Sequence, residues 1–550
     1  MTKTGAPSAV EGGKSESRSL RGTIAESLAS DAARFSDRDR SLLKFHGIFE
    51  GGDRDKSRRL MVRVRVPAGR ITPGQYLGLD DLAGSYGDGS LRVTSRQGLQ
   101  FHGVAKGNLK LLVADINHGL LSTFGTGGDV VRNVMANPVP IKDSVHARIH
   151  DDALRLSRLF RPRSYAYHDL WLGDEKQYAG TVDRREIEPV YGQSYLPSKF
   201  KIALATPDDN TVDVLANDLG IIALFEEERL IGYNFALGGG LGFRPDRPKT
   251  FPFLAIPTCF IEPDDLLPAA EAVVRLHREH GDRNNRDRAR LKYFIAEHGV
   301  AAAKRFLEEC LGHPLADPVP QPVMEVPDLM GWHAQGDGHW FLGIPLPAGR
   351  IADSETIRLR TGLRAVIQKY WPTLVLTPDQ DILLCDLPAH KRAAVEADLR
   401  RFGVQLAEDL IPLERWSLAC PALRSCDLAL AEAECVQPAI LNAIAEVMAG
   451  YGLVKDRISV RISGCSNGCV RPYLGDIGLV GCALGCYRVY VGGDTRGTRL
   501  NSLLRDRVAL ADIAGVLEPL FALYAAEREP MESFGDFCHR VGIERLLSVV

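Results

Sequence analysis

The chain has 550 residues, of which 45% are hydrophobic and 25% charged, and its formal net charge at pH 7 is −3. This composition is ordinary for a globular protein, and the near-neutral charge argues against a general nucleic-acid or membrane-surface binder. The first twenty residues lack the apolar segment of a secretory signal, and no run of about eighteen apolar residues occurs. We therefore expect a cytoplasmic protein with a flexible N-terminal tail and with no nucleic-acid or membrane partner.

The first strand-rich segment, residues 62–103, is basic along one face of each predicted strand. Arg63 and Arg65 alternate with valines in VRVRV. In LRVTSRQGLQFHG one parity of positions is polar throughout, namely Arg92, Thr94, Arg96, Gln100 and His102. Alternate residues of a strand share a face. The pattern is typical of a half-buried sheet with a solvated face, but two neighbouring Arg-rich rows indicate a polyanionic ligand.

Two further basic segments follow. GTGGDVVRNV, residues 125–134, is a glycine-rich turn leading to Arg132, with backbone N–H groups available to an anion. QSYLPSKFKIAL, residues 193–204, is a predicted strand with Lys199 and Lys201 on one face. Either segment alone is more typical of a protein surface than of a binding site.

The second half of the chain repeats the first. PAGRI occurs at residues 67–71 and again at 347–351, and Thr94 corresponds to Thr377 in the second copy. Later, IGYNFALGGGLGFRP and CYRVYVGGDTRGTRL each run from an apolar strand into a glycine-rich turn. Three matches in the same order indicate an ancient duplication. In the second copy the polar row is mostly apolar, so we expect only the first copy to bind a ligand.

Seven of the eleven cysteines lie between residues 420 and 486. Cys420 and Cys426 form a C-x5-C pair, and Cys465 and Cys469 form a C-x3-C pair. Four thiolates are the usual ligands of a 4Fe–4S cluster. This spacing therefore predicts a cluster held by two separate segments.

Two other interpretations of the cysteines stay open at this point. Cys465 and Cys469 make a passable zinc pattern with Cys482 and Cys486, which would suit a zinc-stapled binding protein with no catalytic role. The cysteines could also be packed free thiols. Spacing alone does not separate the three.

The segments ACPALRSCDLALAEAE and SGCSNGCVRPYLGDIGLVG resemble the paired cysteine signature of the sirohaem-dependent sulfite and nitrite reductases. The resemblance covers nearly the whole chain and includes LRGTIAESL, SLRVTSRQGLQFHG, RNVMANP, YLPSKFKIAL and ESFGDFCHRVG. Within this family it is strongest to the haemoprotein (beta) subunits of assimilatory sulfite reductases. The residue pair Cys482 and Cys486 is a departure from the family pattern.

The resemblance implies an α+β, three-lobed fold with an internal pseudo-two-fold duplication. Strands alternate with helices along the chain, as such a fold requires. The implied units are an N-terminal tail and arm (1–54), a ferredoxin-like paired-repeat domain (55–125 plus 327–405), a first repeat domain (126–326) and a second repeat domain with the cluster (406–550).

The resemblance also implies the cofactors and their ligands. A 4Fe–4S cluster would bind Cys420, Cys426, Cys465 and Cys469, and Cys469 would also be the axial ligand of the iron in sirohaem. The carboxylates of sirohaem would bind the polar row of Arg92, Thr94, Arg96, Gln100 and His102, with Arg290, Lys292 and Asn467 as further contacts. The anionic substrate would bind Arg63, Arg132, Lys199 and Lys201.

The implied reaction is the six-electron reduction of sulfite to sulfide in sulfate assimilation, for cysteine biosynthesis. The alternative is a ferredoxin-dependent nitrite reductase that forms ammonia; Lys201 favours sulfite. The glycine run at 236–242 does not match the G-x-G-x-x-G dinucleotide fingerprint. Electrons must then come from a partner, either a flavoprotein subunit with FAD, FMN and NADPH, or ferredoxin.

Overall fold

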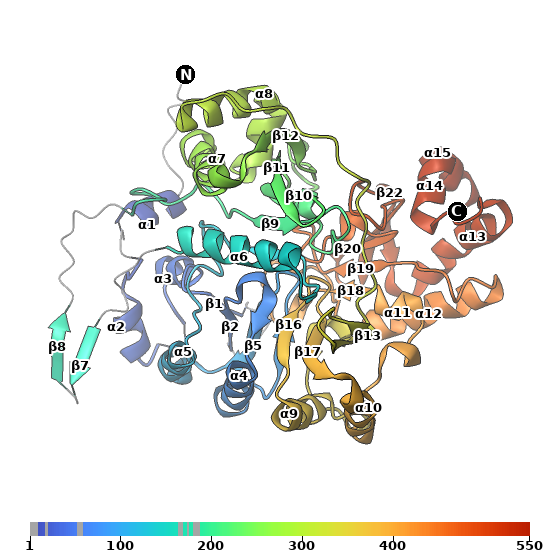
Figure 1. The fold of residues 1–550 in the computed structure, drawn as a ribbon, viewed down its shortest axis with the longest axis horizontal. Helices are drawn as coiled ribbons and strands as arrows, with labels where there is room; N and C mark the ends of the chain where they lie inside the picture. Colours follow the sequence, from blue (N-terminus) through green and yellow to red (C-terminus); the bar gives the residue numbers. More distant parts are fainter. Residues whose placement is uncertain are drawn as a thin grey trace.

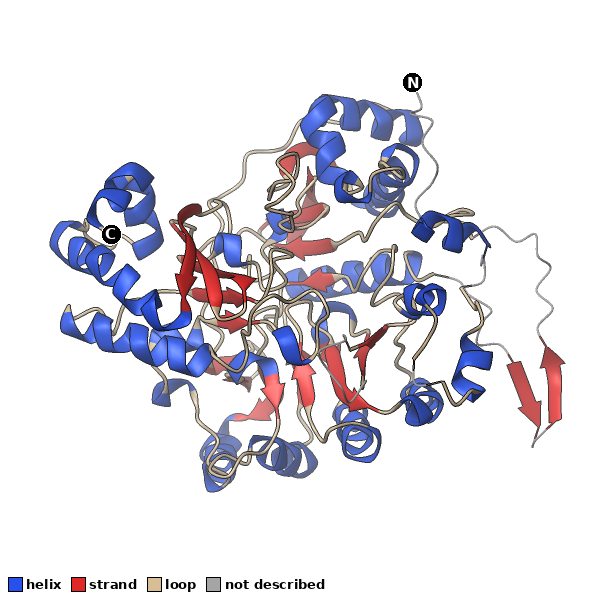
Figure 2. Cartoon of the chain, turned by 180° about the vertical axis from the view of Figure 1, so that it is seen from behind, coloured by secondary structure: helices blue, strands red, loops and turns tan. Residues whose placement is uncertain are grey.

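The computed structural model of the chain describes residues 9–16, 20–32, 34–51, 59–162, 169–172, 175–179 and 188–550. Figure 1 shows three lobes that meet near the middle of the molecule, and Figure 2 shows from behind that most strands lie inside and most helices outside. Residues 1–8, 17–19 and 52–54 of the predicted tail and arm lie outside the described residues. Across the described ranges, no helix is long and apolar enough to cross a membrane.

One lobe contains two five-stranded sheets of matching design. The first has the order β1 (Ile48–Glu50), β2 (Leu60–Val64), β5 (Leu99–Val104), β4 (Leu91–Val93) and β15 (Arg350–Ile351). The second has the order β13 (Gly331–Ala334), β14 (His339–Ile344), β17 (Ile382–Pro388), β16 (Thr373–Leu376) and β3 (Arg70–Ile71). Helices of this lobe are α4 (Pro73–Tyr86), α5 (Leu109–His118), α9 (Leu359–Tyr370) and α10 (Arg392–Arg401). Both sheets share one apolar core, which makes them a single unit.

The two PAGRI segments exchange short strands between these sheets. The strand β3 follows the first PAG turn and pairs with β16, whereas β15 follows the second and pairs with β4. Both turns have an alanine in the left-handed region, Ala68 at φ 51° and Ala348 at φ 50°. Gln97 donates to the carbonyl of Ala68 (3.4 Å), and Gln380 donates to that of Ala348 (3.3 Å). The duplication predicted from the sequence is therefore confirmed down to single hydrogen bonds.

The other two lobes are also copies of each other. The first contains β12 (Ile256–Ile261), β11 (Arg229–Leu237), β10 (Leu219–Glu226), β9 (Ile202–Ala205) and β6 (Met135–Ala136), in that order. The second contains β22 (Ser502–Ala509), β21 (Cys486–Val491), β20 (Ile477–Ala483), β19 (Val460–Ser463) and β18 (Leu418–Ala419) in the same order. In both sheets the last three strands run parallel and the first two antiparallel.

Helices pack against these two sheets. In the first repeat they are α6 (Ser144–Leu159), α7 (Leu266–His280) and α8 (Leu291–Leu311), and they share a core with the strands. In the second they are α12 (Gln437–Gly450), α13 (Ile513–Glu527), α14 (Phe534–Val541) and α15 (Ile543–Val549). The short helix α11 (Pro412–Arg415) and a hairpin of β7 (Asp169–Leu172) and β8 (Glu175–Ala179) complete the described elements of this part.

Part of the expected flexible tail is ordered, which corrects the sequence-based prediction. Residues Ala9–Glu16 form helix α1, followed by α2 (Ile24–Ala29) and α3 (Asp37–Leu43). Lys14 of α1 is only 1% exposed because it reaches into the first repeat, where buried polar partners satisfy its charge. Because lysine is usually exposed, the sequence around Lys14 does not indicate that helix α1 packs against the first repeat.

The proline-rich segment of residues 315–329 covers the second copy of the polar row. Leu329 packs in one apolar cluster with Val375, Leu383 and Cys385, which are the second-copy positions of that row. The carbonyl of Leu329 lies 1.9 Å from where a Cβ on Gly343 would stand, so this segment also requires a glycine there. The second copy is filled by the chain itself.

Candidate active site

The predicted cluster cysteines come together at one edge of the second repeat sheet. Cys420 directly follows β18, and residues 464–469 follow β19, its parallel neighbour, so both segments leave the sheet at the same end. The backbone N–H of Gly464 donates to Sγ of Cys420 at 3.2 Å. A Cβ on Gly464 would lie 2.7 Å from the carbonyl of Ala431, so the two cysteine segments approach this closely only with glycine there.

Burial and the neighbouring Cys469 raise the pKa of the three other thiols. Burial raises the pKa of Cys420 to about 11 and that of Cys465 to about 12, and the next cause in each case is the neighbouring Cys469. Burial and then Cys469 likewise raise the pKa of Cys426. Cys469 therefore lies near all three of the others, and a bound metal cluster would displace protons that these thiols otherwise keep.

The described residues form no site for a single metal ion. Among the described residues, no three His, Cys, Asp or Glu side chains are gathered closely enough to hold one metal ion. This includes the set of Cys465, Cys469, Cys482 and Cys486 that fitted a zinc pattern, since the last two lie on the β20–β21 hairpin. A 4Fe–4S cluster binds each thiolate to a different iron, so its ligands need not converge on one point.

Four half-buried cations, Arg63, Arg132, Lys199 and Lys201, lie near Cys469. An isolated parallel bridge between Val131 and Phe200 brings Arg132 beside the segment of Lys199 and Lys201. The guanidinium of Arg132 is fixed by the carbonyls of Gly128 (2.9 and 3.1 Å) and Thr126 (3.3 Å). Arg132 and the two lysines therefore lie on two neighbouring segments that the bridge holds together.

Arg63 reaches the same place from β2. Its guanidinium stacks over the ring of Phe49 at 4.4 Å. With the amide of Gln100 oriented to face it, the side-chain oxygen of Gln100 accepts from Nε of Arg63 at 2.7 Å. Burial lowers the pKa of Arg63, while Cys469 and Cys426 oppose that shift.

The two lysines lack a neutralising carboxylate within the described residues. Burial lowers the pKa of Lys199 to about 8, and the nearby guanidinium of Arg290 lowers it further, whereas Cys469 acts to raise it. Burial and the neighbouring Arg96 put the pKa of Lys201 well below its ordinary value. Cations buried without a counter-ion are costly, so this pocket is built for an anionic ligand.

The predicted polar row divides into two groups. Arg96 donates to the carbonyl of Asn133 (3.1 Å) and to Oδ1 of Asn217 (2.5 Å), and Thr94 accepts from the backbone N–H of Gly98 (3.0 Å). These two lie between the first repeat and the loop of Cys469, with Ser95 donating to the Cys469 carbonyl (2.8 Å).

Arg92 and His102 instead contact the first cysteine segment. Arg92 forms an ion pair with Glu434 and donates to the carbonyl of Ala419 at 2.6 Å. Nδ1 of His102 lies 3.1 Å from Oγ of Ser425, and burial together with Arg350 and Arg92 keeps the pKa of this imidazole well below its usual value. Both side chains therefore support the first cysteine segment, which contains Cys420 and Cys426.

Arg290 and Lys292 are also bound within the protein. Arg290 makes a two-point ion pair with Asp218 (3.0 and 2.8 Å). Lys292 donates to the carbonyls of Gly240 (2.9 Å), Gly242 (2.8 Å) and Phe251. A Cβ on Gly242 would stand 3.0 Å from the carbonyl of Asn467, so Lys292 holds the glycine-rich loop directly against the loop of Asn467 and Cys469.

Sequence reasoning missed the acidic partners that fix these cations, above all Glu434, Asp218 and Asp213. It also missed Arg471, two residues after Cys469, which pairs with Asp213 and Asp379 (2.9 Å). One sequence signal was available for Asp218, because DLGI at 218–221 matches DIGL at 476–479 in the second repeat. Asp213 and Arg471 share only a left-handed backbone, at φ 47° and φ 57°.

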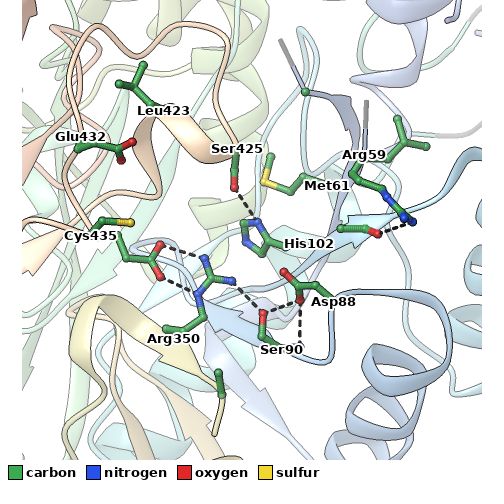
Figure 3. A pocket seen from close by; sticks show the side chains of 15 residues that line it. Arg59, Met61, Asp88, Ser90, His102, Arg350, Leu423, Ser425, Glu432 and Cys435 are labelled. Carbon is green, nitrogen blue, oxygen red and sulfur yellow. Dashed lines mark hydrogen bonds and ion pairs between the residues drawn. The ribbon is translucent and has the colours of Figure 1, made fainter. Parts of the chain in front are cut away.

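A cavity of about 760 Å³ opens beside the first cysteine segment (Figure 3). Leu423 and Ser425 form one wall, and His102 and Arg350 come from the sheet opposite. Figure 3 shows Arg350 bonded to Ser90 (3.0 Å) and His102 directed at Ser425. The first cysteine segment thus has a solvent-facing side.

A duplicated α+β fold with four thiols beside a buried basic pocket defines an oxidoreductase that combines an iron–sulfur cluster with an anion site. Residues 153–315 match the nitrite and sulphite reductase 4Fe-4S domain, and residues 52–118 and 333–402 match the nitrite/sulfite reductase ferredoxin-like half domain. The chain belongs to the nitrite and sulfite reductase family. The matched stretch 153–315 lies within the first repeat and contains only Cys259 and Cys310, whereas Cys420, Cys426, Cys465 and Cys469 lie in the second repeat.

Similar proteins extend over nearly the full chain. The sulfite reductase [NADPH] hemoprotein beta-component of Xanthomonas campestris pv. campestris is 42% identical, over 97% of this chain and 96% of that protein. The sulfite reductase [ferredoxin] of Synechococcus elongatus is 39% identical, over 99% of this chain and 92% of that one. The solved structure of Mycobacterium tuberculosis NirA superposes with a TM-score of 0.79 at 21% identity, covering 98% of both chains, which confirms the fold.

Proposed function

We propose that this enzyme reduces sulfite to sulfide with six electrons, in sulfur assimilation for cysteine biosynthesis. One observation carries the proposal: Cys469 lies near both the three other thiols and the four half-buried cations. A residue in that position can link an electron store to the place where an anion binds. The names of the similar proteins, sulfite reductases coupled to NADPH or to ferredoxin, support sulfite as the substrate.

The donor set fits a 4Fe–4S cluster and sirohaem. Cys420, Cys426, Cys465 and Cys469 would hold the cluster, with Cys469 shared with the sirohaem iron. The carboxylates of sirohaem would be bound by Arg96, Thr94 and Gln100, because Arg96 forms no ion pair within the described residues and a guanidinium suits a polyanion. Arg92 and Arg290, which are paired with Glu434 and Asp218, would support these contacts together with His102, Lys292 and Asn467. When bound, the two cofactors supply multi-electron transfer to a coordinated anion.

The protein's own groups then act on the substrate. Arg63 and Arg132 are fixed by Gln100 and by backbone carbonyls, so they can hold an oxyanion without reorganising. Lys199 and Lys201, whose pKa values are lowered, can give up protons as oxygen leaves. Each charge-assisted contact is worth about 1.5–3 kcal/mol.

Nitrite is the second candidate substrate. Both anions fit a pocket of four cations, and Lys201 favours sulfite because the doubly charged sulfite gains more from an additional ammonium group. Turnover of both anions by the purified enzyme with a dye as electron donor decides between them. A higher kcat/KM for nitrite would reverse the assignment.

The electron donor, location and domain division are also proposals. The donor is a flavoprotein subunit or ferredoxin, and supplying each purified protein to the same enzyme identifies it. We place the enzyme in the cytoplasm, because Cys482 and Cys486 lie close together on one hairpin and form no disulfide, as in a reducing compartment. We propose the division into 1–54, 55–125 with 327–405, 126–326 and 406–550; the apolar core that the two ferredoxin-like halves share supports joining 55–125 with 327–405.

The variant Cys469→Ser tests the proposed function. We expect it to lose the visible absorption of the tetrapyrrole and most of the iron, with turnover at least about a hundredfold lower, since one sulfur serves both cofactors. The matched control is Cys482→Ser, which should keep full absorption, iron content and turnover. Full cofactor loading in Cys469→Ser, or loss of iron in the control, would refute the ligand assignment.

A further inference from the structure

The backbone just ahead of the two active-site lysines is held by cations from distant parts of the chain. Arg283 donates to the carbonyls of Ser194 (3.4 Å) and Tyr195 (2.7 Å). Lys14 donates to the carbonyl of Leu196 (2.7 Å), and Arg286 to that of Pro197 (3.3 Å). Four consecutive carbonyls are thus taken by three cations. Tyr195 has a left-handed φ of 56° and is buried, so this strained segment depends on those bonds.

Asp129 connects the same cations to the turn that carries Arg132. Its carboxylate accepts from Arg286 (2.8 and 2.9 Å) and from Lys14 (3.2 Å), and its carbonyl accepts from the backbone N–H of Leu196 (3.0 Å). It is 3% exposed. Burial alone would raise the pKa of Asp129, but Lys14 and Arg286 lower it below its usual value, so the carboxylate is charged. That negative charge also acts on Arg132.

Lys14 reaches this point from helix α1, which lies beside α3 (Figure 1). Within the helix it pairs with Glu11, and Glu11 pairs in turn with Arg283 at 2.7 Å. Both α1 residues are nearly fully buried. The network therefore joins the N-terminal helix to the two segments that present Arg132 and the lysines Lys199 and Lys201.

We propose that helix α1 is a working part of the anion pocket and that Lys14 is its positioning residue. Lys14 fixes the segment ahead of Lys199 through the carbonyl of Leu196. It also neutralises Asp129, whose negative charge would otherwise weaken the binding of an anion at Arg132. This inference rests on the proposed function only in naming sulfite, because the same effect applies to any small anion in the pocket.

The test uses the full-length holoenzyme with the variants Lys14→Met and Lys14→Arg. The control is Lys304→Met on α8, which removes the surface ion pair between Lys304 and Asp317 (2.6 Å). For each protein we would measure KM and kcat for sulfite and nitrite with a dye donor, the Kd of each anion from the visible spectrum, iron per chain and the midpoint of thermal unfolding.

For Lys14→Met we expect KM and Kd for both anions to rise about fivefold to tenfold, with kcat within about twofold of the wild type and iron unchanged. Lys14→Arg should recover wild-type affinity within about twofold, because the charge is restored. Lys304→Met should bind anions like the wild type. A lower unfolding midpoint with unchanged Kd would show that α1 only anchors the N-terminus and would overturn the proposal.

A second variant, Asp129→Asn with Lys14 kept, makes the proposal testable if Lys14→Met folds poorly. It removes the negative charge that acts on Arg132, so anion affinity should rise severalfold over the wild type. An Asp129→Asn protein that keeps its iron but binds anions more weakly than the wild type would contradict the electrostatic role. Failure of the wild-type enzyme to bind sulfite in the same titration would instead refute the proposed function. The two failures are therefore distinguishable.

Discussion

Lys199 and Lys292 carry the same ammonium group in opposite surroundings. All three donors of Lys292 are taken by backbone carbonyls, and the side chain is 1% exposed. Lys199 has no carboxylate partner in the described part of the chain and lies among other cations. At this scale the hydrogen-bond partners decide the role, since Lys292 is a fixed support and Lys199 is available to a ligand.

The pKa of Lys199 gives a prediction on pH dependence. Burial and the cations Arg290 and Arg132 lower this pKa to about 8, against the opposing charges of Cys469 and Asp218. The ammonium must be charged to attract an anion, so KM should be flat below about pH 7 and should rise as the pH passes about 8. Steady-state assays from about pH 6 to about pH 10 measure it.

Nitrite and the variant Lys199→Arg serve as controls for this effect. Nitrite keeps its charge across this range, so a rise in its KM reports the enzyme and not the substrate. Lys199→Arg should move the rise to higher pH, because a guanidinium stays protonated. The same pH dependence in both proteins would show that another group titrates.

Among the secondary-structure elements, the exchanged strands β3 and β15 join the two ferredoxin-like halves. Each is only two residues long and would have no partner in its own half. A Cβ on Gly349 would lie 2.3 Å from the carbonyl of Val93, and one on Gly69 would lie 2.3 Å from that of Leu376. Both glycines also have φ near +73°. The exchange therefore depends on glycine for two reasons, close packing and backbone conformation.

The variant Gly349→Ala tests the importance of this packing. Gly338 is a matched control, because it also has a left-handed φ, of 88°, but a Cβ there meets nothing within 4 Å. We expect Gly338→Ala to cost about 1 kcal/mol from conformation alone, and Gly349→Ala to cost at least about 2 kcal/mol more. Urea unfolding followed by circular dichroism gives both values. Equal losses would mean that the strand exchange adapts without strain.

At the level of the whole molecule, one buried ion network joins all three lobes. Arg471 of the second repeat pairs with Asp213 of the first and with Asp379 of the ferredoxin-like lobe (2.9 Å). Arg461 also pairs with Asp213, at 2.8 Å. Asp213 is 2% exposed. Because Arg471 is two residues after Cys469 in the chain, the position of the loop that carries Cys469 depends on this junction.

Asp213→Asn should loosen the junction. Removing one partner of a buried ion pair typically costs about 3–5 kcal/mol, since the remaining charge stays buried. We expect lower stability and less iron per chain, with Asp536→Asn, whose ion pair with Arg499 is partly exposed, as the milder control. Unfolding curves and iron analysis measure both. Wild-type stability in Asp213→Asn would show that Asp379 alone suffices for Arg471.

The sign of the pH effect at this junction follows from Asp213. Burial would raise its pKa, but Arg461 and Arg471 hold it below the ordinary value. A carboxyl whose folded pKa is lowered stabilises the protein above its unfolded pKa of about 4 and loses that contribution as the pH falls further. The wild type should therefore lose stability on acidification more steeply than Asp213→Asn.

The sequence by itself determined the duplication, the parity of the polar row and the two cysteine pairs. These features are local: strand alternation, turn glycines and short spacings are set by backbone geometry within a few residues. The α+β fold and family followed from the same motifs, and the similar proteins and the solved structure confirm both.

Only the tertiary structure decided which of the basic residues are left without a carboxylate partner and are therefore available to an anionic ligand. Arg92 is neutralised by Glu434 and Arg290 by Asp218, whereas Lys199 and Lys201 are left among other cations. Docking of α1 through Lys14 was equally invisible in the sequence. The physical reason is that burial and charge pairing join residues far apart in the chain, and their energies depend on the folded surroundings and not on local pattern.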